Sequence, residues 1–70
     1  MDMYRVGQIC KARRRAMGIP QKSVALSLHM SYQNIGAFEN GRCNNAIILL
    51  WYLRNIDGLS VDDFKGVSTK

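Results

Sequence analysis

The chain has 70 residues, of which 47% are hydrophobic and 21% charged, and its formal net charge is +5. A chain of this length buries only about 60% of its unfolded surface, which allows one small core and leaves little room for a second domain, a deep substrate cleft or a cofactor-binding fold. The composition is that of a globular rather than a disordered protein, and no apolar run approaches the ~20 residues that span a bilayer.

The positive charge is concentrated in the first part of the chain. Residues 1–42 hold seven Lys or Arg and two acidic residues, whereas residues 43–70 hold three of each, so the first part carries the whole net charge. A basic surface of this kind is typical of proteins that bind phosphate groups, nucleic acid above all. Composition alone leaves a second interpretation open, in which the excess charge only keeps the protein soluble.

The first predicted helix spans residues 3–17. Asp2 suits its N-cap and Gly18 suits its end. Arg13 or Arg14 fills the middle of the inward stripe of this helix, whose other members are Met3, Val6, Cys10 and Met17, with Ile9 beside them. No segment of the chain shows the alternation of a strand, so the fold is predicted to be all-α.

Two short helices follow, over residues 21–28 and 32–40. Pro20 suits the start of the first, and Ser31 suits the N-cap of the second. His29, Met30 and Ser31 separate the two helices, and Gly41 ends the second. The side chains expected to point inward are Val24, Ala25, Leu28, Ile35 and Phe38.

A fourth helix is predicted over residues 46–56, capped by Asn44 or Asn45 and ended by Gly58. The helix is apolar around more than one face. The stripe expected to fill the core consists of Ile47, Leu50 and either Leu53 or Arg54. The other stripe has no evident place in so small a core, and it consists of Ile48, Trp51 and Tyr52.

The end of the sequence predicts a short fifth helix. Ser60 begins a pattern similar to a capping box, and Val61 and Phe64 are expected to pack back on the core. Residues 66–70 are expected to form a flexible tail, so the predicted domain spans residues 1–65.

One spaced set of residues resembles a known family. The segment Arg14-x3-Gly18-x2-Gln21-x3-Ala25-x5-Ser31-x3-Ile35-x3-Glu39-x-Gly41 resembles the lambda-repressor-like helix-turn-helix regulators, which include phage repressors and Cro proteins. The resemblance covers roughly residues 5–65. It implies a compact five-helix domain in which the second and third helices form the helix-turn-helix. It also implies that Arg14 and Glu39 form a structural ion pair rather than DNA contacts.

The resemblance assigns DNA contacts to residues of the predicted helix-turn-helix. Gln21, at the start of the second helix, is expected to bind a phosphate. The other candidates for phosphate contact are Lys22, Ser31, Asn40, Arg42 and Arg13, although Ser31, Asn40 and Arg42 could equally be an N-cap, a C-cap and a surface charge. In this family the usual N-cap of the second helix is Ser or Thr, where this chain has Pro20.

Base contacts are expected from the outward face of the third helix. The candidates are Tyr32, Gln33, Asn34, Gly36 and Ala37. The Gln33 amide can donate to and accept from adenine in the major groove, a pairing that discriminates by about 1–3 kcal/mol. Gly36 costs about 1 kcal/mol of helix propensity relative to alanine. It is either a tolerated defect or a place where DNA approaches the helix closely.

The sequence carries no pattern of an enzyme, a metal site or a cofactor site. His29, Cys10 and Cys43 lack the spacing of zinc ligands, and no Gly-rich phosphate loop, nucleophile elbow or carboxylate pair is present. No small-molecule substrate is therefore expected. Two cysteines without a hydrophobic N-terminal signal region predict a protein of the reducing cytoplasm, of a bacterium or of a phage host.

These observations predict a DNA-binding transcriptional regulator, specifically a small repressor of phage, prophage or plasmid type. Its regulation is expected to follow its own concentration, as in a phage switch or an autorepressed operon. A single small domain contacts few bases, so a homodimer is expected on two half-sites about 34 Å apart. The predicted dimer surface consists of Ile48, Trp51 and Tyr52, unless these side chains close the core instead. The alternative is an antitoxin or other protein-interaction module that binds a partner through the helix over residues 46–56.

Overall fold

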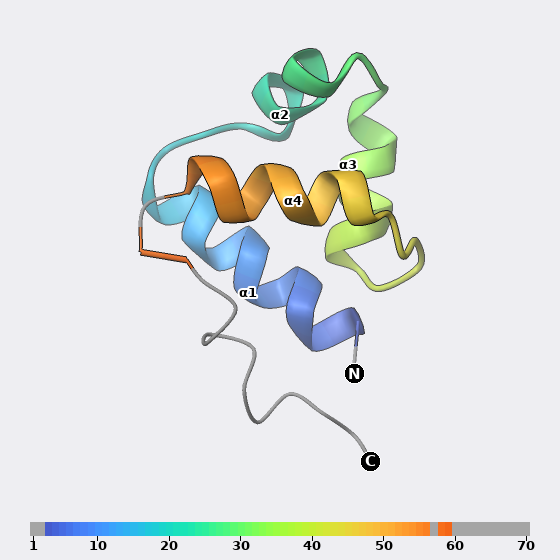
Figure 1. Cartoon of the computed structure of the whole chain (residues 1–70), viewed down its shortest axis with the longest axis horizontal. Coiled ribbons are helices and arrows are strands. Elements are labelled where there is room, and N and C mark those ends of the chain that lie inside the picture. Colours follow the sequence, from blue (N-terminus) through green and yellow to red (C-terminus); the bar gives the residue numbers. More distant parts are fainter. Residues whose placement is uncertain (1–2, 57, 60–70) are drawn as a thin grey trace.

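The computed structural model describes residues 3–56, 58 and 59, and this part of the chain is all-α. Its four helices are α1 (Met3–Ala16), α2 (Gln21–Leu28), α3 (Tyr32–Glu39) and α4 (Ala46–Asn55). Figure 1 shows α2 across the top of the molecule, α3 running down one side, and α1 and α4 extending away from α3. The predicted cap Asp2, the predicted fifth helix with Val61 and Phe64, and the predicted tail lie outside the described residues.

All four helices contribute to one core. Its fully buried members include Val6 and Cys10 from α1, Val24 from α2, Ile35 and Phe38 from α3, and Ile48 and Tyr52 from α4. Ala25, Ile56 and Leu59 complete the buried cluster, and Leu28 packs against it while half-buried. The inward residues predicted for α1 are confirmed except Met17, which is 44% exposed. Helix α1 ends at Ala16, so Met17 lies just beyond the last residue of the helix.

The orientation of α4 is the opposite of the predicted one. Ile48 and Tyr52 are fully buried, whereas Ile47 is 59% and Leu50 54% exposed. Ile48 and Tyr52 are four residues apart and therefore share one helical face, which lies against the core. The Tyr52 ring stacks on Phe38 with 6.0 Å between centroids, and Trp51 meets Tyr52 edge-on at 5.5 Å. Ile48 and Tyr52 therefore cannot form the dimer surface predicted for them, and of that trio only Trp51 is partly exposed.

The predicted helix ends are largely confirmed. Gly18, Gly41 and Gly58 follow the ends of α1, α3 and α4 and all have positive φ values, the conformation that glycine adopts without a steric penalty. Asn45, rather than Asn44, caps α4, because its Oδ1 accepts from the Ile47 backbone N–H at 2.9 Å.

One close contact between helices was not predicted. A Cβ on Gly7 would lie 2.4 Å from the Glu39 carbonyl oxygen and 2.5 Å from that of Phe38. Glycine at this position therefore lets α1 approach the backbone of α3 directly. None of the described helices is both long and apolar enough to cross a membrane.

Candidate nucleic-acid interface

The helices α2 and α3 and the turn between them form the candidate interface, called here the α2–α3 unit. The turn comprises residues 29–31, and His29 closes α2 in the left-handed conformation, with φ of 56°. The Met30 backbone N–H donates to the Ala25 carbonyl at 3.0 Å, which fixes the chain as it leaves α2. Ala25 is buried in the core cluster, as predicted for an inward-pointing side chain. The structure therefore has two short helices joined by a three-residue turn at the predicted position.

The outward face of α3 carries polar side chains at its start. Tyr32, Gln33 and Asn34 are exposed, while Ile35 and Phe38 are buried behind them. Gly36 and Ala37 follow on the same helix and are half-buried. The five residues predicted to contact bases therefore comprise three exposed, projecting side chains and two positions with a methyl group or no side chain at all.

The residues predicted to contact phosphate surround this face, with one exception. Lys22, Ser31, Asn40 and Arg42 are exposed, and Gln21 is half-buried. The Lys22 ammonium lies 5.7 Å from the centroid of the Tyr32 ring, which brings the start of α2 next to the start of α3. Arg13 is the exception, because its Nη1 donates to the carbonyl of Gly58, beyond the end of α4, at 3.1 Å.

The first turns of both helices lack side-chain caps. Pro20 and Ser31 occupy the N-cap positions of α2 and α3 with extended backbone, but neither side chain makes a capping hydrogen bond. Ser31 is therefore the N-cap by position, as predicted, while its hydroxyl stays out of the cap. Backbone N–H groups at such a helix start suit an anion.

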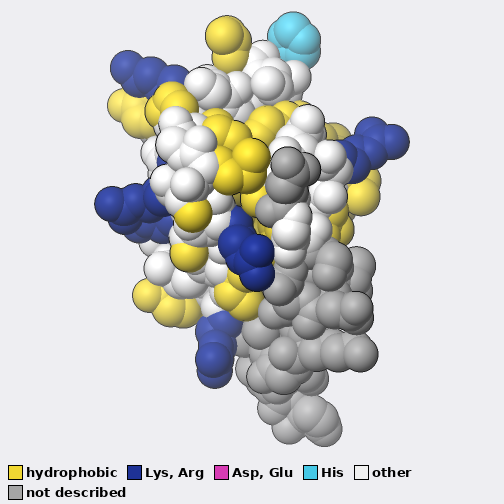
Figure 2. Space-filling model, turned by 90° about the vertical axis from the view of Figure 1, so that its left-hand side faces the viewer, with side chains coloured by type: hydrophobic (Ala, Val, Ile, Leu, Met, Phe, Trp, Pro, Cys, Tyr) yellow, Lys and Arg dark blue, Asp and Glu magenta, His cyan; other side chains and the backbone are white. Residues whose placement is uncertain are grey.

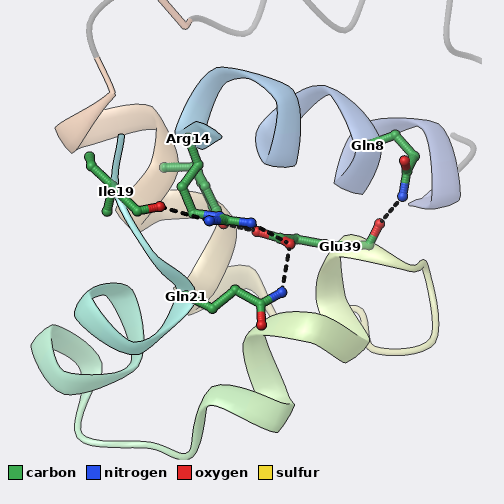
Figure 3. Close-up of polar contacts among 6 residues, drawn as sticks. Gln8, Arg14, Ile19, Gln21 and Glu39 are labelled. Carbon is green, nitrogen blue, oxygen red and sulfur yellow. Dashed lines mark hydrogen bonds and ion pairs between the residues drawn. The ribbon is translucent and has the colours of Figure 1, made fainter. Parts of the chain in front are cut away.

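A buried carboxylate joins the α2–α3 unit to the rest of the fold (Figure 3). Arg14 Nε donates to Glu39 Oε2 at 2.8 Å and Arg14 Nη2 to Oε1 at 3.2 Å, so the predicted ion pair is present. Gln21 Nε2 donates to Oε1 at 3.0 Å, and the Tyr52 hydroxyl donates to Oε2. Glu39 thus has hydrogen-bond partners on α1, α2 and α4.

Two further hydrogen bonds complete this cluster, which we call the Glu39 network. Arg14 Nη1 donates to the Ile19 carbonyl at 2.7 Å, in the connection between α1 and α2. Gln8 Nε2 donates to the backbone carbonyl of Glu39 at 2.9 Å. The roles of Gln8 and Tyr52 were missed by the sequence analysis. No local signal marks either role, because Gln8 and Tyr52 reach Glu39 across 31 and 13 positions of the chain.

The Glu39 network shifts the pKa values of its members. Burial by itself would raise the pKa of Glu39, but the hydrogen bonds from Arg14, Tyr52 and Gln21 outweigh it and hold this pKa below its ordinary value of 4.5. Burial and the hydrogen bond to Glu39 raise the pKa of the Tyr52 hydroxyl. Burial opposes the charge of Arg14, yet the bonds to Glu39 raise the pKa of its guanidinium. The pair is therefore ionised and Tyr52 neutral near pH 7.

The described surface is basic. Eight described residues are Lys or Arg, and the only acidic one among them is Glu39, which is 1% exposed and paired. Figure 2, which views the molecule from the side away from α3, shows Lys and Arg side chains around a central group of hydrophobic ones and no acidic side chain among the described atoms. The positive charge therefore extends beyond the α2–α3 unit.

Metal ligands and cysteines are the remaining reactive groups of the described residues. No group of three or more His, Cys, Asp or Glu that could hold a metal ion occurs among them. Burial raises the pKa of the Cys10 thiol to about 12, while Cys43 is half-buried. Comparisons of the chain with protein-family models, with curated proteins and with solved structures found no match.

Proposed function

We propose that the protein is a sequence-specific, double-stranded-DNA-binding transcriptional regulator, a small repressor with the lambda-repressor-like fold. The single observation that carries the proposal is the outward face of α3. Its first turn presents a phenol and two carboxamides to solvent, while its apolar side chains are buried. Carboxamides at the start of an α-helix are suited to hydrogen-bond base edges in the major groove.

The surroundings of α3 support the proposal. Lys22, Ser31, Asn40 and Arg42 are exposed, and the N-terminal turns of α2 and α3 lack side-chain caps. In this proposal these groups bind phosphates and so fix the register of α3 on the duplex. Arg13 is the weakest member of the predicted set, because part of its guanidinium is bonded to the Gly58 carbonyl.

The proposal includes a homodimer. Its interface is the outward face of α4 and not the predicted trio, of which Ile48 and Tyr52 are buried. Ile47 and Leu50 project from this face beside a groove of about 180 Å³, whose other lining residues are Leu28, Trp51, Arg54 and Asn55. Protruding aliphatic side chains and a hollow on the same face suit an interface between two identical surfaces. The same groove supports the second candidate function, an antitoxin or interaction module that binds a partner protein there.

Selection of duplexes from a random pool, followed by fluorescence anisotropy, tests the function. A selected duplex should bind roughly 10³-fold more tightly than its shuffled version, and its footprint should show two half-sites about 34 Å apart. Gln33→Ala should lose about 1–3 kcal/mol of discrimination at one base pair. Equal, weak binding to selected and shuffled duplexes would contradict the proposal.

Paired charge variants separate phosphate contacts from general attraction. Lys22→Ala should lower the affinity for all duplexes and reduce the slope of log K against log salt by about 1. Lys11→Ala removes the same charge from α1 and should leave this slope nearly unchanged.

Leu50→Glu tests the dimer surface on α4. It should weaken cooperative binding to two half-sites but not binding to one half-site, whereas the partner-binding alternative predicts no effect of Leu50→Glu on either.

A further inference from the structure

Gly36 differs from the other described glycines. Gly18, Gly41 and Gly58 have positive φ values, and a Cβ on Gly7 would overlap the backbone of α3. Gly36 has a helical backbone. Among the described residues beyond its own stretch of helix, only the Gln21 amide has atoms within 4 Å of an added Cβ, with Nε2 at 3.6 Å and Oε1 at 4.0 Å. The fold itself therefore has room for a side chain at position 36.

The helix also favours another residue at this position. Glycine is the least favourable helix former apart from proline, and α3 has only eight residues. Neither backbone geometry nor a neighbouring atom within the described chain requires glycine here. A requirement for a bare helix surface at Gly36 would then come from a contact outside the described residues.

The neighbour of Gly36 identifies the chemistry of such a contact. Gln21 Nε2 uses one of its two hydrogens to donate to Glu39 Oε1. Because Glu39 is fixed by Arg14 and Tyr52, the amide is held in place and its second N–H remains as a donor. Lys22, the next residue, is exposed and positively charged. A fixed donor beside a cation and an uncovered stretch of helix backbone suits a phosphodiester with its sugar.

We propose that Gly36, instead of making the base contact predicted for it, extends the phosphate site expected at Gln21 into one seat for the sugar–phosphate backbone of a DNA strand. The inference rests on the proposed DNA-binding function. A phosphate oxygen accepts from the second N–H of Gln21, and the adjoining deoxyribose lies in van der Waals contact with the Gly36 Cα. A methyl group at position 36 holds the strand away from Gln21. Because the backbone is the same at every step, this contact contributes equally to all sequences.

Gly36→Ala tests the seat, with Gly7→Ala as the matched control. Thermal unfolding is followed by circular dichroism, and binding by anisotropy of a labelled mixed-sequence duplex at low salt and of the selected duplex. Gly36→Ala should raise the Tm by about 4–8 °C, because alanine is the better helix former. It should weaken binding to both duplexes by a similar factor, of order tenfold. Gly7→Ala should lower the Tm, since its Cβ would lie 2.4 Å from the Glu39 carbonyl oxygen.

A double-mutant cycle tests whether the two residues act together. Gln21→Ala should weaken binding to both duplexes, and Gly36→Ala combined with Gln21→Ala should weaken it little further, because either change already removes the seat. Wild-type affinity in Gly36→Ala, a lower Tm in Gly36→Ala, or additive losses in the double variant would overturn the inference and leave the proposed function standing. Failure of the wild-type protein to bind either duplex would overturn both.

Discussion

Replacing Glu39 by Gln should destabilise the protein far more than its small chemical change implies. Glutamine has nearly the same shape as glutamate and keeps an acceptor for the Tyr52 hydroxyl. It removes the negative charge from the guanidinium of Arg14, which is only 6% exposed. Leaving one partner of a buried ion pair without its counter-charge costs about 3–5 kcal/mol. The Arg14–Glu39 pair is almost completely excluded from water, so solvent screening reduces this figure little.

The expected loss is a large fraction of the total stability. Domains of this size are stable by roughly 0.05–0.15 kcal/mol per residue, and each kcal/mol corresponds to about 4–8 °C in Tm. A loss of about 3 kcal/mol therefore lowers the Tm of Glu39→Gln by roughly 12–24 °C. Urea titration followed by far-UV circular dichroism measures the free energy of unfolding. Trp51, the one tryptophan of the chain, lies against Tyr52 and provides a second probe beside the Glu39 network.

The double variant Arg14→Met/Glu39→Gln is the matched control. It removes both charges, so no buried ion is left unpaired, and it should be more stable than Glu39→Gln alone. The reasoning fails if Glu39→Gln loses less than about 1 kcal/mol, or if the double variant is no more stable than the single one.

Four further predictions concern two titrating groups, the two cysteines and the cap of α4. The pKa of Glu39 in the folded protein is below its ordinary value of 4.5. The ionised Glu39 should therefore contribute to the free energy of unfolding above pH 4.5, and this contribution should decline as the pH falls below 4.5. Denaturant titrations at several pH values measure the decline. The pKa of Tyr52 is raised rather than lowered, so the free energy of unfolding should fall as the pH rises above 10, the ordinary pKa of tyrosine. The variant Tyr52→Phe should reduce this loss of stability at alkaline pH. A disulfide reagent at pH 8 should label Cys43 in the folded protein and spare Cys10, whose pKa is about 12, until the protein unfolds, as peptide mass mapping can show. Asn45→Ala should cost about 0.5–2 kcal/mol, because Asn45 caps α4.

Each of these four predictions has a result that would contradict it. A stability that does not change between pH 5 and pH 3 would mean that Glu39 titrates equally in the folded and unfolded chains. An alkaline loss unchanged in Tyr52→Phe would assign that loss to other groups. Equal labelling rates for the two cysteines would show that the core around Cys10 opens freely, and an Asn45→Ala variant as stable as the wild type would remove the cap from the account of α4.

Local signals in the sequence were enough to locate the helices. Glycines at 18, 41 and 58 and a polar cap before α4 act within a few residues, so they could be interpreted without the tertiary structure. The ion pair of Arg14 with Glu39 was obtained from the family resemblance, and the structure contains it. The α2–α3 unit also has the predicted bounds to within a residue.

The features that failed or were missed depend on contacts between distant segments. Residues 46–53 of α4 are almost all apolar, so hydrophobic periodicity could not tell which face of α4 is buried. In the structure the buried Tyr52 hydroxyl donates to Glu39, a contact between distant segments that the sequence of α4 does not show. Gly7 was overlooked because its importance lies in the backbone of α3, which is about thirty residues further along the chain.

The burial of Glu39 also bears on how the protein would find its place on DNA. Within residues 3–56, 58 and 59, the one carboxylate is hidden, so an approaching polyanion is attracted by these residues from many directions and repelled by none of their side chains. First encounters with a duplex would then be frequent and poorly oriented. The correct orientation would be selected afterwards, by sliding and turning on the DNA until the short side chains of α3 meet base edges. In such a search ionic strength sets the time spent on arbitrary DNA, and the carboxamides of Gln33 and Asn34 set where the protein stops.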